Sequence, residues 1–143
     1  MNFSKAIKSA PALVYATGTA DRNGLTIDTA GFQGVALVVQ FATIAASGVN
    51  SIKAQAGDAS DLSDAADIAG TSQAVAVTDD DEIRIIDIVK PPGRYVRVVI
   101  DKDATNACAE SAVAHLYDPD AQPTTVPSTS AGELHVSPAY GTA

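Results

Sequence analysis

The chain of 143 residues has the length of a single domain, and its 17 Asp and Glu against 9 Lys and Arg give a formal net charge of −8. This balance argues against a general nucleic-acid binder and against a protein that docks on anionic membranes, because both need clustered Lys and Arg. The single cysteine, Cys108, excludes an internal disulfide and a cysteine-based structural zinc site. Val and Ile number 24 against 6 Leu, and this balance favours strands.

Short apolar runs separated by turn residues extend from about residue 11 to about residue 118, a pattern typical of all-β domains. Residues 12–17 and 25–28 predict the first two strands, with a turn at Asn23-Gly24 between them. The next run, residues 35–44, is apolar on both faces. Such a strand is covered on both sides, and in a sandwich only one cover is the opposite sheet. The other must be a loop, an arm or a second subunit.

The remaining predicted strands are residues 51–56, 73–78, 83–89, 94–101 and 111–117, where apolar and polar side chains alternate. With about eight strands in all, we expect an all-β fold: a two-sheet antiparallel β-sandwich of the jelly-roll type. Residues 11–118 are expected to form this domain. Residues 1–10 are expected to form an extended N-terminal arm, and residues 119–143 a C-terminal arm rich in Pro, Thr and Ser.

An acidic segment interrupts the strand pattern, with aspartate at every third position: Asp58, Asp61, Asp64 and Asp67. Three-residue spacing predicts one short helix or 3₁₀ turn over residues 58–68, with these carboxylates on a single exposed face. Leu62 and Ile68 are expected to contact the sandwich. The segment is either a solvated face or a charged contact surface for a basic partner, and the sequence leaves both interpretations open.

Side chains that could carry catalysis are few. His115 and His135 belong to no spaced set of metal ligands, and Cys108 has no basic neighbour to lower its pKa. Residues 101–105 begin like a calcium-binding loop, but Asn106 stands where the loop needs Gly and Ala112 where it needs a bidentate Glu. We therefore expect a protein that is not an enzyme, with no catalytic residues, no metal and no cofactor.

Both arms carry apolar side chains suited to contact with a neighbouring subunit. An arm loses about 1 kcal/mol or more of conformational entropy for each residue that it orders, so only a large shared contact would hold it. We expect the chain to associate with itself. The residues expected at this interface are Phe3, Ile7, Phe41, Val126, Leu134, Val136 and Tyr140.

Four segments between residues 30 and 125 form a pattern that covers most of the predicted domain. They are Gly31-Phe32 before the strand at residues 35–39, Lys53-Ala54-Gln55-Ala56-Gly57-Asp58 before the acidic segment, Pro92-Gly93-Arg94-Tyr95 at the start of the penultimate strand, and Ala112-Val113-Ala114-His115-Leu116-Tyr117 before the proline-rich tail. This pattern resembles small virion proteins of tailed bacteriophages and prophages, capsid decoration proteins above all.

The resemblance implies a β-sandwich that oligomerises, often as a trimer, on the outer surface of a capsid. Its partners would then be other copies of itself and the lattice of the major capsid protein, with no nucleic acid and no membrane. Its location would be the virion, after synthesis in the host cytoplasm. The alternative is a component of a phage tail, or a β-sandwich adhesion module that binds a receptor or a carbohydrate.

Overall fold

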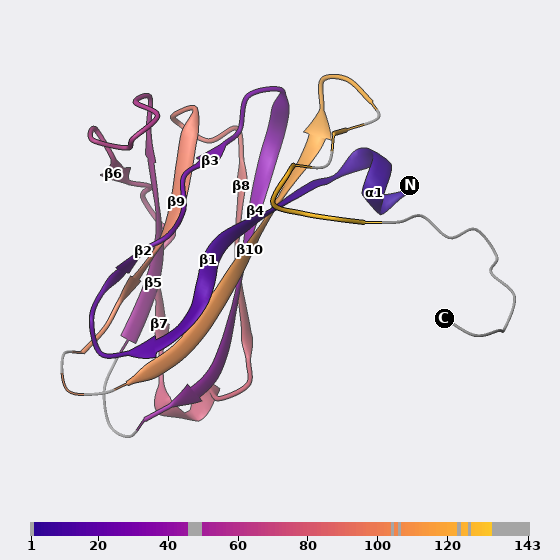
Figure 1. The fold of residues 1–143 in the computed structure, drawn as a ribbon. Helices are drawn as coiled ribbons and strands as arrows, with labels where there is room; N and C mark the ends of the chain where they lie inside the picture. The colour runs from indigo at the N-terminus through magenta and orange to yellow at the C-terminus, as the bar shows by residue number, and fades with distance from the viewer. Residues whose placement is uncertain are drawn as a thin grey trace, which may run out of the picture.

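The computed structural model describes residues 2–45, 50–103, 105, 107–122, 124–125 and 127–132. It confirms the expected β-sandwich, because two antiparallel sheets pack together (Figure 1). The four-stranded sheet has the order β1 (Lys8–Gly18), β10 (Cys108–Pro119), β4 (Phe32–Ile44) and β8 (Ile83–Val89). The six-stranded sheet consists of β2 (Arg22–Asn23) and β3 (Ile27–Asp28) beside β9 (Tyr95–Asp101), then β5 (Asn50–Gly57), which pairs with β6 (Ala66–Asp67) and β7 (Gln73–Val75).

The strand pairs are nested along the chain. β1 pairs with β10, β3 with β9, β4 with β8 and β5 with β7, so strands equally far from the middle of the chain lie together. Further pairing of β4 with β10 and of β5 with β9 completes the two sheets. The chain therefore resembles one long hairpin rolled into a sandwich, which is jelly-roll connectivity. The acidic segment lies at the tip of this hairpin, between β5 and β7.

The core lies between the sheets, and β4 crosses its centre. Val35, Leu37, Val39 and Phe41 of β4 have no exposed surface, and neither do Val96, Val98 and Ile100 of β9. The expectation that Phe41 contacts a partner subunit is therefore wrong. Both faces of this strand are apolar in sequence, and Phe41 is on the face that turns to the six-stranded sheet.

The helix expected at residues 58–68 is absent. The chain there forms two turns and then β6, and Leu62 adopts a positive φ of 55°. The physical reason is that aspartate side chains compete with the backbone for hydrogen bonds. The Asp64 carboxylate accepts the backbone N–H groups of Asp58 and Ala59, and the Asp61 carboxylate accepts that of Ser63. Leu62 is buried and Ile68 packs against the core, as expected.

Elsewhere in the described part of the chain there are two short helical elements, α1 (Phe3–Ala6) and the 3₁₀ turn η1 (Val77–Asp79). β1 begins at Lys8 rather than near residue 11, so part of the expected N-terminal arm belongs to the sheet. The chain beyond β10 returns along the N-terminus. The Thr124 N–H donates to the Lys5 carbonyl at 3.0 Å, and the Ser130 hydroxyl donates to the Ser9 carbonyl at 2.9 Å. The described parts of the two arms thus lie side by side.

Candidate functional site

The outer face of the four-stranded sheet carries a row of apolar side chains that crosses all its strands. The register places Pro11 of β1 beside Val113 of β10, Val113 beside Val38 of β4, and Val38 beside Ile85 of β8. Ile83 follows on the same face of β8. Ile83 and Ile85 are each 54% exposed and Val113 is 41% exposed, while Pro11 and Val38 are partly exposed. We call these five residues the outer apolar patch.

The outer face of the six-stranded sheet is different in character, because charged and amide side chains occupy it. Lys53 forms ion pairs with Asp67 and Asp101 at 3.2 and 3.3 Å, and Arg97 donates two hydrogen bonds to the Gln55 side chain. Such side chains keep a sheet face in contact with water. Only the four-stranded sheet therefore presents an apolar outer face.

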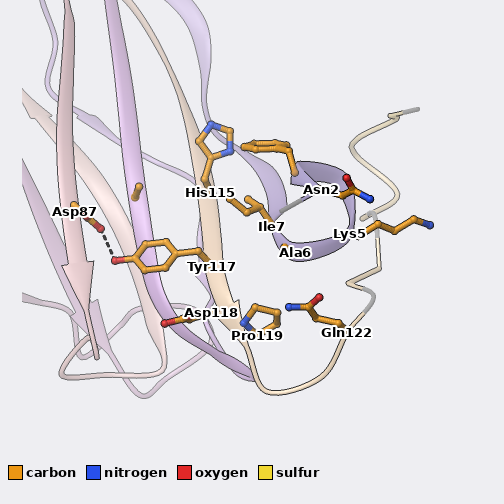
Figure 2. Close-up of a pocket in the computed structure, with 12 residues that line it drawn as sticks. Asn2, Lys5, Ala6, Ile7, Asp87, His115, Tyr117, Asp118, Pro119 and Gln122 are labelled. Atoms are coloured by element: carbon orange, nitrogen blue, oxygen red, sulfur yellow. Dashed lines mark hydrogen bonds between the residues drawn. The ribbon is translucent and has the colours of Figure 1, made fainter. Parts of the chain in front are cut away.

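A hollow of about 760 Å³ lies between α1 and the outer face of the four-stranded sheet, beside the outer apolar patch (Figure 2). Its floor contains Ala36, His115 and Tyr117, and Phe3 of α1 contacts the His115 ring edge to face, with 5.4 Å between ring centroids. Ile7 lines the hollow and is half-buried. The predicted interface residues Phe3 and Ile7 are thus brought together at this sheet face.

The two rings that line the hollow, those of His115 and Tyr117, are each hydrogen-bonded to another side chain. The Ser9 hydroxyl lies 2.9 Å from His115 Nδ1, and Tyr117 Oη donates to the Asp87 carboxylate at 2.6 Å. Burial lowers the pKa of His115, while burial and the hydrogen bond to Asp87 raise the pKa of Tyr117 to about 12. Both rings are therefore neutral near pH 7.

The contact between Ser9 and His115 joins a hydroxyl to an imidazole, as nucleophile–base pairs do. Such pairs also need a third group that orients the base. Among the described residues, Ser9 is the one hydrogen-bond partner of the His115 ring, and the Asp87 carboxylate is bonded to Tyr117 instead. The Ser9–His115 contact therefore links β1 to β10 within the sheet, and the Ser9 carbonyl also accepts from Ser130 of the chain after β10.

A buried ionic cluster joins the two sheets at the other end of β10. Glu110 accepts a hydrogen bond from Arg22 Nη1 at 2.9 Å, and its second carboxylate oxygen lies 2.9 Å from Lys102 Nζ. Neither Glu110 nor Lys102 has exposed side-chain surface, and Lys102 Nζ also donates to the carbonyls of Gly18 and Cys108. Lys102 Nζ therefore has two carbonyl acceptors and a carboxylate counter-charge, and the cluster links the two sheets.

The sequence analysis missed this cluster, although one signal marked it. Every second residue of a strand points to the same face, and Glu110 alternates in step with the buried residues Ala112, Ala114 and Leu116 of β10. Alternation alone therefore predicts that Glu110 points inward. Cys108 is buried next to it. Burial and a hydrogen bond to Glu110 raise the Cys108 pKa to about 12. The thiol is therefore protonated at neutral pH, in keeping with a packing role.

The four predicted acidic residues do not share one face. Asp61 and Asp64 bond the backbone of their own turns, Asp58 accepts the Arg94 N–H, and Asp67 bonds Gln55 and Lys53. Hydrogen bonds hold the pKa values of Asp61, Asp64 and Asp67 below the usual value for a carboxyl. The segment at the tip of the hairpin thus has turns held by Asp61 and Asp64, and Asp58 and Asp67 connect it to Arg94 and to β5.

Four of the predicted interface residues, Val126, Leu134, Val136 and Tyr140, lie outside the described residues. In the described part of the chain, no group of three or more His, Cys, Asp or Glu side chains is placed to hold a metal ion. No helix among the described residues is long and apolar enough to cross a membrane. No protein family matches this chain, and no curated protein matches its sequence.

Proposed function

We propose that this protein is a non-enzymatic virion structural protein that decorates and stabilises a phage capsid as a homo-oligomer, with a trimer as the expected state. The observation that carries the proposal is the outer apolar patch, a row of partly exposed apolar side chains across a whole sheet. Exposed apolar surface of this kind marks contact with another protein. The sequence resemblance to capsid decoration proteins supplies the class of partner.

The fold and the state of the polar groups agree with this role. Jelly rolls are frequent among capsid proteins, although this is an argument by analogy of fold, since lectins use the same fold. Of the residues that line the hollow beside α1, His115 is bonded to Ser9 and Tyr117 to Asp87, so these groups already serve the structure. The proposed location is the outer surface of the virion, reached after synthesis in the host cytoplasm.

Co-sedimentation tests the proposal. The full chain is mixed with empty capsids assembled from the major capsid protein whose gene lies nearest to its own, and bound protein is quantified after centrifugation. We expect saturable binding at a fixed ratio to capsid subunits. Binding should weaken with salt if the acidic chain docks on basic lattice sites, because salt screens exposed charges.

Two results would contradict the proposal. The first is a full chain that stays in the supernatant at every ratio to capsids. The second is specific binding on a glycan array by a chain that ignores capsids, which would support the adhesion-module alternative. The Ser9→Ala variant serves as a matched control: it removes the hydroxyl bonded to His115, and we expect it to bind capsids like the wild type.

A further inference from the structure

We infer that the outer apolar patch is the surface through which one copy of this chain binds a second copy. This inference rests on the proposed function and deepens it, because it assigns the self-association to one face of the sandwich. The surface consists of Pro11, Val38, Ile83, Ile85 and Val113, contributed by all four strands of the four-stranded sheet.

The charge distribution identifies a second copy as the occupant. The chain carries a net charge of −8, so two copies repel one another wherever their charged surfaces meet. The outer apolar patch contains no ionisable side chain. Gln40 and Ser111 lie in the same row as Ile83, and the row on the other side of the patch contains Ala36, His115 and Asp87, whose carboxylate is bonded to Tyr117. A strongly basic partner would gain nothing here, whereas the charged side chains at the hairpin tip would attract it. The centres of protein interfaces are depleted of charge in the same way.

The shape of the surface also suits an identical partner. Rows of β-branched side chains on one sheet pack against those of another at about 10 Å, as they do inside any β-sandwich. The row that contains Ser9 and His115 is already covered by other parts of the chain, because Phe3 of α1 contacts the His115 ring and the Ser130 hydroxyl donates to the Ser9 carbonyl. A second copy would bury the outer apolar patch, which the arms leave exposed.

The distribution of exposed side chains on β8 strengthens the assignment. β8 is an edge strand of the four-stranded sheet, and its side chains on the outer face include Ile83, Ile85 and Val89, with Asp87 alone charged. The Asp87 carboxylate accepts the Tyr117 hydroxyl. The edge itself is protected in the usual way, because Arg84 is charged and Lys90 and Pro91 follow the strand directly. The apolar outer face of β8, and not its edge, is therefore the surface assigned to the second copy.

Self-association of substituted full-length chains tests the inference. In the double variant Ile83→Lys/Ile85→Lys, two ammonium groups stand in the patch while the net charge becomes less negative, so general repulsion between copies falls. We expect its dissociation constant for self-association, measured by analytical ultracentrifugation, to rise about tenfold or more. Lysine is tolerated on edge strands, and circular dichroism should show an intact sandwich.

The matched control is Leu25→Lys, because Leu25 is 47% exposed and lies outside the patch. It should associate like the wild type.

A second measurement uses cysteine cross-linking. Val113→Cys places a thiol in the patch, whereas the native Cys108 is fully buried. A short bis-maleimide should link two Val113→Cys chains and leave Leu25→Cys chains unlinked.

Each outcome decides the inference. A wild-type oligomer that is lost in the double variant and kept in Leu25→Lys supports it, as does cross-linking specific to Val113→Cys. A wild-type oligomer that survives Ile83→Lys/Ile85→Lys overturns it and leaves the proposed function standing. A wild-type chain that stays monomeric at the highest concentration tested overturns it together with the homo-oligomeric part of the proposed function, while capsid co-sedimentation decides the capsid-binding part separately.

Discussion

Removing the charge of Glu110 should severely destabilise the fold. The Glu110 carboxylate lies 2.9 Å from both Arg22 Nη1 and Lys102 Nζ, and the side chains of Glu110 and Lys102 have no exposed surface. Glu110→Gln preserves the shape of the side chain but leaves the Lys102 ammonium buried without a counter-charge. Its amide N–H group would also face one of the two cations. Breaking a buried ion pair in this way costs about 3–5 kcal/mol.

This loss is large against the whole stability of a single domain, about 5–15 kcal/mol. For a chain of this length, a loss of 3–5 kcal/mol lowers the melting temperature by about 10–20 °C. Urea unfolding followed by circular dichroism and tyrosine fluorescence measures the free energy directly, since the chain has no Trp and 4 Tyr. We expect an earlier midpoint with an unchanged slope.

Two further variants show whether desolvation is the cause. Lys53→Gln removes a cation that pairs with Asp67 and Asp101 on a solvent-exposed sheet face, and should change the stability little because solvent screens exposed ion pairs. The double variant Lys102→Met/Glu110→Leu removes both buried charges, and should recover much of the stability lost in Glu110→Gln. If Glu110→Gln is as stable as Lys53→Gln, the reasoning is refuted.

Three other predictions follow from single contacts. Gly93→Ala should lower the free energy of unfolding, measured in urea, by about 1–3 kcal/mol, because a Cβ there would stand 2.8–2.9 Å from the backbone of Gly57. In the control Gly18→Ala the new Cβ has nothing within 4 Å, so the stability should change little. Cys108, with its pKa raised to about 12, should resist thiol reagents near neutral pH until urea unfolds the chain; fast labelling of the native protein would contradict its burial. The folded-state pKa of Asp64 lies below the ordinary 3.8, so its contribution to stability is present above that pH and is lost as the pH falls through the folded value. Acid titration of unfolding should therefore show a shallower loss for Asp64→Asn, and an identical acid profile would count against the role of its hydrogen bonds.

The strands were predictable because alternation is a local property. β8 has the predicted bounds, and β9 begins one residue after its predicted start. Apolar and polar residues alternate in these runs as the two faces of a pleated strand require. The sequence by itself therefore determines these strands and the all-β class. The turns held by Asp61 and Asp64 were not predicted, because spacing alone does not show whether an aspartate points to solvent or accepts a backbone N–H.

Tertiary structure alone decided which apolar face of β4 is the core. Phe41 and Val38 stand on opposite faces of one apolar strand, and only the position of the six-stranded sheet makes the first a core residue and the second part of the outer apolar patch. The same holds for Glu110, whose inward parity was visible but whose cationic partners come from β2 and from the chain just after β9. Alternation along a strand determines which of its residues share a face. Contacts between segments far apart in the chain determine which of the two faces is buried and which side chains meet there.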